Sequence, residues 1–180
     1  MKQVLRFHLY ALSLLLLIGF SSCKKNTDND NDGGGPGDGQ YYLRFNANGV
    51  KKEFTGFTIV DFAEIQGVYN YAFQGRNSHA DLRGMTISIY TPAVLTQPAS
   101  FTYQNFAPLN VPQTHMGYMT EDRTMFVSMT TLFPDYVANI SVTEITPDYM
   151  KGTFSGKLTN EDWTASITIT NGEFKLKKAR

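Results

Sequence analysis

The chain has 180 residues, and its 16 basic and 16 acidic side chains give a formal net charge of zero. Such a chain lacks the clustered basic surface that nucleic acid requires, so we expect no nucleic-acid partner. The single cysteine, Cys23, excludes an intrachain disulfide framework. A folded domain must therefore be stabilised by burial of apolar side chains, and a chain of this length can form a sizeable core.

Residues 1–22 have the pattern of an export signal. The basic residues Lys2 and Arg6 precede an apolar run from Leu9 to Phe20. This run is shorter than the roughly 20 apolar residues that a membrane-spanning helix needs, but it suits the core of a signal peptide. No later segment is apolar enough to span a membrane.

The signal ends in Phe20-Ser21-Ser22-Cys23, which resembles the lipobox of bacterial lipoproteins, although that family usually has Leu at the position of Phe20. The resemblance implies that the Cys23 sulfur receives a diacylglycerol, that the chain is cut before Cys23, and that the new amino group is acylated. Several acyl chains on one residue make a stable anchor. The alternative is an ordinary secretory signal in which Cys23 is incidental.

Residues 23–40 form the predicted lipidated end and a tether. After Cys23 the segment is rich in Asp and Gly and has no apolar side chain to bury, so we expect a flexible coil that reaches ~20–25 Å. Its Asp28, Asp30 and Asp32 resemble the acidic signal for surface export in Bacteroidota-type lipoproteins, but Lys24 and Lys25 precede them. A spacer without such a signal is equally compatible. We expect an outer-membrane protein on the periplasmic or cell-surface face, attached through Cys23.

Residues 41–180 are predicted to form a single β domain. Runs of β-favouring residues alternate with turn signals, among them Asn48-Gly49, a preferred hairpin turn. Met150–Leu158 is a predicted strand weakened by Gly152 and Gly156, and Asn171-Gly172 interrupts the last strand as a bulge. The other predicted strands are 41–46, 50–54, 68–74, 85–90, 101–104, 116–120, 124–131, 140–145 and 163–176, and residues 57–65 form a weaker run. No helical period is present outside the signal peptide. About nine or ten short strands indicate an antiparallel β-sandwich or barrel.

Two stretches resemble a family of small uncharacterised Bacteroidota lipoproteins, which are known as a domain of unknown function. The longer stretch runs from Ile145 through Gly152-Thr153-Phe154-Ser155 to Asn171-Gly172-Glu173-Phe174, and the shorter is Arg44 to Gly49. The resemblance implies a secreted β-rich domain behind a lipobox. It implies no catalytic residue.

Metal chemistry has little support in the residue pattern. His79 and His115 show no zinc-site spacing, and we expect no metal and no cofactor. His115 lies near Met116, Met119, Met125 and Met129, a set that could hold copper. We interpret these methionines as core packing instead.

Catalytic motifs are also absent from the sequence. It contains no Gly-x-Ser-x-Gly, and nothing assigns a serine partner to either histidine. Carboxylate-based hydrolysis needs two facing acids. The available acids are Asp61, Glu64, Glu121, Asp122, Asp135 and Glu161. We interpret them as solvated turn residues.

Aromatic residues are the most suggestive surplus, with 10 tyrosines and one tryptophan. Aromatic faces beside polar groups can stack on sugars or peptides. Trp163, Tyr149 and Tyr136 are the candidate ligand-binding residues because they lie at strand edges beside polar turns. The alternative is that tyrosines suit half-buried sheet surfaces. We expect a monomeric, non-catalytic binding or accessory module for a glycan or protein ligand. The alternatives are a carboxylate-based hydrolase and a purely structural envelope protein.

Overall fold

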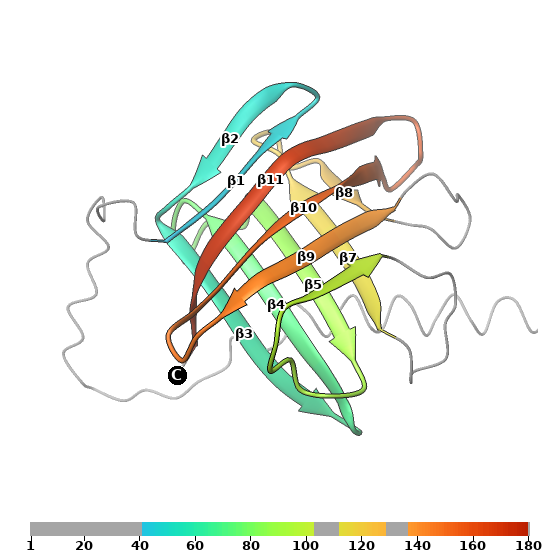
Figure 1. Cartoon of the computed structure of the whole chain (residues 1–180). Coiled ribbons are helices and arrows are strands. Elements are labelled where there is room, and N and C mark those ends of the chain that lie inside the picture. The colour runs from blue at the N-terminus through green and yellow to red at the C-terminus, as the bar shows by residue number, and fades with distance from the viewer. Residues whose placement is uncertain (1–40, 103–111, 129–136, 180) are drawn as a thin grey trace, which may run out of the picture. The chain divides into compact units, whose positions relative to one another are not determined.

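The computed structural model describes residues 41–102, 112–128 and 137–179, and this part of the chain is all-β. It contains eleven strands and no helix (Figure 1). The strands are β1 (Tyr42–Ala47), β2 (Val50–Phe54), β3 (Phe57–Ile65), β4 (Val68–Arg76), β5 (Gly84–Thr91), β6 (Ala99–Thr102), β7 (Gln113–Met119), β8 (Met125–Val127), β9 (Ala138–Ile145), β10 (Tyr149–Asn160) and β11 (Ser166–Lys178). The predicted all-β class is confirmed. No helix in these residues is long and apolar enough to cross a membrane.

The strands form one sheet in the order β2-β1-β11-β3-β4-β5-β7-β8-β10-β9-β6, with an additional pairing of β10 with β11. That additional pairing closes a circuit of strands, because β11 also pairs with β3 and β10 also pairs with β8. Both corner pairings are short, and the one between β11 and β3 is parallel. In Figure 1, β1, β11, β10 and β9 lie in one layer, and β3, β4, β5 and β7 cross behind them. The architecture is that of a β-sandwich or barrel, with two layers that join at the corners.

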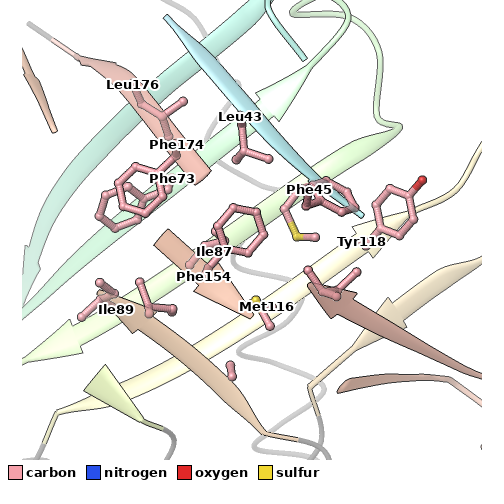
Figure 2. Close-up of a cluster of buried hydrophobic side chains, with 14 of the residues drawn as sticks. Leu43, Phe45, Phe73, Ile87, Ile89, Met116, Tyr118, Phe154, Phe174 and Leu176 are labelled. Carbon is pink, nitrogen blue, oxygen red and sulfur yellow. The ribbon is translucent and has the colours of Figure 1, made fainter. Parts of the chain in front are cut away.

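The core lies between the two layers. On β5 the alternating residues Met85, Ile87 and Ile89 are each 0 % exposed, which confirms the predicted inward face. Aromatic rings from both layers also pack in this core. The centres of the Phe73 ring on β4 and the Phe174 ring on β11 are 4.9 Å apart (Figure 2). Among the described residues, every buried core side chain lies between Leu43 and Leu176. The β domain therefore carries its own core.

The Asn48-Gly49 turn joins β1 and β2 as predicted. Both residues have positive φ, 47° and 83°, which a two-residue hairpin of this kind requires. The Asn48 side chain also accepts a hydrogen bond from the backbone N–H of Thr168 on β11, at 2.8 Å. The turn is therefore fixed to the neighbouring strand as well as to its own hairpin.

Asn171-Gly172 is a bulge within a single strand, β11, as the alternating pattern predicted. The register with both neighbours shifts at this point, and Asn171 has a φ of 51°. The start of that strand was predicted wrongly. Trp163 has a φ of 61° and lies in the turn before β11, since Asp162 accepts hydrogen bonds from Thr164 and bends the chain there. The strand begins at Ser166 instead.

Candidate functional site

Three hairpins meet at one end of the β domain and border an open cleft of about 590 Å³. The hairpins are β1–β2, β7–β8 and β10–β11, which the chain supplies from widely separated segments. The apolar part of the lining consists mainly of Ala47, Tyr118, Phe126 and Ile167. Polar side chains complete it, among them those of the β7–β8 turn. The cleft thus combines an apolar floor with a polar rim, which is the usual composition of a binding site.

A second cleft of about 380 Å³ lies beside the first and shares Lys52, Tyr118 and Glu121 with it. It continues along β2 as far as Phe54 and reaches Arg83 on the opposite layer. We call the two clefts together the β2 trough, because β2 supplies lining residues to both. The β2 trough therefore follows one strand along its length.

An ion pair crosses the β2 trough. Lys52 Nζ lies 2.9 Å from Glu121 Oε1, and the two side chains are 27 % and 81 % exposed. Lys52 stands opposite Phe45 in the β1–β2 ladder, so it is on the inner face of β2. The hydrogen bond between the two side chains raises the pKa of Lys52 and lowers the pKa of Glu121. Both groups are therefore charged at neutral pH, and their contact ties β2 to the β7–β8 turn.

Tyr118 forms the floor beneath this ion pair. It is 3 % exposed, and its ring meets the Phe45 ring edge-on at 5.2 Å. In Figure 2 its hydroxyl points away from the other labelled core side chains. Burial raises the Tyr118 pKa, while nearby Lys52 lowers it and Glu121 raises it. The net rise in the Tyr118 pKa keeps its phenol protonated, so the hydroxyl can donate a hydrogen bond within the β2 trough.

The two adjacent acids of the β7–β8 turn are both held ionised. Asp122 accepts hydrogen bonds from the Thr120 hydroxyl and from the Thr124 backbone N–H, and these bonds lower its pKa. The Glu121 pKa is lowered by Lys52. A general acid in glycoside hydrolysis needs a raised pKa. This pair therefore does not supply the acid that carboxylate-based hydrolysis would require.

The remaining acids considered from the sequence are dispersed. Asp61 on β3 accepts a hydrogen bond from Gln74, and burial raises its pKa. Glu64 and Glu161 are exposed, on β3 and in the β10–β11 turn. Asp135 lies outside the described residues.

β2 is an edge strand in the part of the chain that the structure describes. It pairs with β1 on one side, and its other side has no ladder partner there. In a hairpin with a two-residue loop, Val50, Lys52 and Phe54 exchange hydrogen bonds with β1. Lys51 and Glu53 then direct their backbone N–H and C=O groups to the free edge. The β2 trough is thus bordered by unpaired backbone groups.

The candidate residues Trp163 and Tyr149 do not come together. Trp163 is 43 % exposed in the β10–β11 turn, two residues before Ala165, which lines the β2 trough. Tyr149 begins β10, at the end of that strand farther from the turn. Tyr136 lies outside the described residues. Trp163 therefore belongs to the hairpin end of the fold and Tyr149 to the opposite end.

Tyr149 has a charged environment of its own. Its hydroxyl donates a hydrogen bond to Glu144 Oε1, which is the main reason that its pKa is raised. Lys175 Nζ lies 4.7 Å from the centre of the Tyr149 ring and 5.9 Å from that of the Tyr41 ring. A lysine thus lies close to two tyrosine rings, a favourable cation–π arrangement. Sequence reasoning missed this cluster because it depends on how β10 and β11 pair.

The pleat of β7 separates His115 from Met116 but not from Met119. The expected core packing holds for Met116 and not for Met125, which is 43 % exposed. Met116 is 2 % exposed in the core, whereas its neighbour His115 faces the other side and meets the Tyr90 ring edge-on at 5.7 Å. His79 packs against Phe57. Met129 lies outside the described residues. Within the described ranges, no group of three or more His, Cys, Asp or Glu side chains could hold a metal ion.

No protein-family model, curated protein or solved structure matches this chain. The assignment of its fold and candidate sites is therefore based on its own sequence and structure.

Proposed function

We propose that this chain is a lipid-anchored outer-membrane protein whose β domain is a non-catalytic binding module, and that the β2 trough takes an extended segment of a partner protein. The observation that supports this proposal is that the two clefts follow the free edge of β2. Strand addition to an exposed sheet edge is a recurring mode of peptide recognition. The backbone provides affinity, and the pockets beside it select side chains.

The dimensions of the β2 trough suit such a segment. β2 has five residues, which corresponds to about 17 Å of extended chain. A partner strand would bond to the outward-facing backbone groups of Lys51 and Glu53. Alternate side chains of the partner would then point into the two clefts, because successive residues of a strand face opposite sides.

The side chains along the β2 trough indicate a mixed-charge ligand. Lys51 pairs with Glu53 at 2.8 Å and Lys52 with Glu121 at 2.9 Å. A partner with both acidic and basic side chains can exchange these ion pairs for its own with little loss, because exposed ion pairs contribute little stability. An apolar side chain of the partner would cover the floor at Tyr118.

The proposed anchor places the first cleft of the β2 trough away from the membrane. The described chain begins at Tyr41, next to the first residue of β1, whereas the first cleft lies at the other end of β1, beside Ala47, and the second cleft extends back along β2 to Phe54, opposite Leu43. The six residues of β1 separate Tyr41 from the first cleft by about 20 Å. A tether from Cys23 would therefore present the first cleft toward a partner.

Backbone-directed substitutions test the binding proposal. The chain from residue 24 onward is used to select binders from a displayed library of random linear peptides. Glu53→Pro removes one outward-facing N–H, whereas Glu53→Ala removes the same side chain and keeps that donor. We expect Glu53→Pro to weaken selected peptides about tenfold relative to Glu53→Ala, the equivalent of about one hydrogen bond.

Equal affinities for the proline and alanine variants would contradict strand addition. A glycan-array screen provides the competing outcome: binding of a sugar that is lost in Trp163→Ala would assign the hairpin end to a glycan instead. The anchor is tested separately. Cys23→Ser should release the protein from the membrane fraction or leave its signal peptide uncut. Attachment of a cut Cys23→Ser chain that persists in about 1 M salt would contradict the lipoprotein proposal.

A further inference from the structure

Basic side chains and tyrosines share the outer face of β10 and β11, at the end where the described chain begins. The members of this group are Tyr41, Tyr149, Lys151, Lys175 and Lys177, and we call it the Tyr-Lys face. Lys151 stands directly opposite Lys175 in the β10–β11 ladder, and Tyr149 stands opposite Lys177. Because residues two apart on a strand share a face, all four strand residues point to the same side. The flanking positions, Met150 and Leu176, point into the core.

The Tyr-Lys face carries more positive than negative charge. Like charges directly opposite each other in a sheet are destabilising, yet Lys151 and Lys175 occupy such a pair. Within the described ranges, none of its three lysines forms an ion pair. Lys151 and Lys177 are also exposed.

The nearby acids are few, and two of them have partners. Glu144 lies opposite Lys151 on β9 and accepts the Tyr149 hydroxyl hydrogen bond, and since a neutral phenol removes no charge, this acid offsets one of the three lysines. Glu173 is 2.7 Å from Arg44. Asp148 is exposed in the β9–β10 turn. An external anion would relieve the repulsion between the opposed lysines.

The Tyr-Lys face also lies where the tether enters the domain. Tyr41 is the first described residue, and only the 17 residues 24–40 separate it from Cys23. In Figure 1 the C-terminus and the β9–β10 turn lie at the same end of β10 and β11. The hairpins that form the β2 trough include the opposite ends of these two strands. A short tether therefore keeps the Tyr-Lys face close to any surface that holds Cys23.

We propose that the Tyr-Lys face docks on the anionic lipid headgroups of the membrane that carries the anchor. Lysines near a membrane surface are attracted to anionic lipids, and tyrosine rings prefer the interface between headgroups and hydrocarbon. This inference rests on the proposed lipid anchor, which sets the membrane as the nearest surface. Docking by this face would fix the orientation of the domain and hold the first cleft of the β2 trough on the side away from the lipid.

The experiment measures cosedimentation of the unlipidated chain, residues 24–180, with vesicles of phosphatidylcholine that either contain or lack phosphatidylglycerol. This fragment contains the whole described core, and it carries no lipid, so its result does not depend on Cys23. We expect binding to the vesicles with phosphatidylglycerol only. The binding should disappear in about 1 M salt, where the Debye length is about 3 Å.

The variants assign that binding to the Tyr-Lys face. Each lysine should contribute about fivefold in affinity, so the triple variant K151E/K175E/K177E should bind at least 100-fold more weakly, on the order expected for about 1 kcal/mol per basic residue. The neutral triple variant K151Q/K175Q/K177Q should lie between it and the parent. The control is Lys157→Glu, further along the same strand and about 20 Å from Lys151, which should change binding less than threefold. Far-ultraviolet circular dichroism checks that each variant is folded.

Absence of binding to the vesicles with phosphatidylglycerol would overturn the proposal. So would equal binding to both kinds of vesicle, or an equal loss in the folded triple variant and the Lys157→Glu control. A Cys23→Ser chain that leaves the membrane fraction while the fragment fails to bind vesicles would leave the anchor standing and reject the docking face. A cut Cys23→Ser chain that stays in the membrane fraction in about 1 M salt, while the fragment binds vesicles as expected, would reject the anchor alone.

Discussion

The substitution Gly152→Ala gives the sharpest prediction. The sequence alone predicts that it stabilises the protein, whereas the structure predicts that it destabilises it. From the sequence, glycine weakens a strand, and alanine should stabilise it by roughly 0.5–1 kcal/mol. In the structure a Cβ at this position would lie 2.1 Å from the Ser141 backbone oxygen and 2.6 Å from Phe174 Cζ. Gly152 and Phe174 stand directly opposite each other on β10 and β11. The ring occupies the space that a side chain would need.

Neither neighbour can move away at low cost. Phe174 is 0 % exposed and packs on Phe73, and the Ser141 oxygen belongs to β9, the strand paired with β10. Overpacking of a core typically costs about 1–3 kcal/mol, against about 0.4–1 kcal/mol gained by restricting the unfolded chain. We therefore expect Gly152→Ala to lower the free energy of unfolding by about 1–2 kcal/mol.

The measurement is urea unfolding of the chain from residue 24, followed by far-ultraviolet circular dichroism. The midpoint should fall while the slope stays unchanged, which marks a change in stability alone. Thr153→Ala, an exposed neighbour on the same strand, is the control and should stay within about 0.5 kcal/mol. Gly172→Ala should behave like Gly152→Ala, because its Cβ would lie 2.3 Å from the Phe154 oxygen. A midpoint that rises in Gly152→Ala would refute the packing argument.

Three further predictions concern the turn, the ion pair and the tyrosine environment. Asn48→Ala should destabilise the protein by about 1–2 kcal/mol in thermal unfolding, since it loses a side-chain hydrogen bond and replaces an asparagine, which tolerates positive φ, with an alanine, which tolerates it less well. The hydrogen bond from Lys52 lowers the Glu121 pKa, so the stability it adds is present above the unfolded-state pKa and is lost as pH falls through the lower folded value. Glu121→Gln should remove this pH dependence in acid titrations monitored by circular dichroism, and an unchanged profile would contradict it. The Tyr149 pKa is raised by Glu144, so the stability from their hydrogen bond should persist up to the unfolded-state pKa and vanish as pH rises through the folded one. The absorbance difference between the parent and Tyr149→Phe should place the Tyr149 pKa above 10.0, the ordinary value for tyrosine, and Glu144→Gln should lower it.

The local features of the fold follow from local sequence signals. Alternation on β5 identifies its core face because the pleat has a period of two residues. Asn48-Gly49 identifies its turn because few residue pairs accept positive φ at both positions. Trp163 is misassigned because its positive φ depends on Asp162, whose capping of the turn the alternating pattern hides.

The candidate sites depend on contacts that no local pattern contains. The β2 trough brings together Asn48, Glu121 and Ala165, which are far apart in the chain. The inward position of Lys52 follows from its place opposite Phe45, but its ion pair crosses from one layer to the other. The Tyr-Lys face needs the register of β10 against β11, and a shift of one residue would turn Lys151 into the core.

The position of β11 has a consequence for the order of assembly. This strand pairs with β1, β3 and β10, and it follows all three in the chain. The backbone N–H of Ala179, just beyond it, also bonds to the Val60 oxygen. The earlier strands therefore cannot complete the circuit until the last one arrives, and such non-local pairing is slow. A chain that emerges vectorially must therefore stay open between β1, β3 and β10 until β11 is available, and loss of β11 would leave the short β8–β10 pairing as the remaining described corner between the layers.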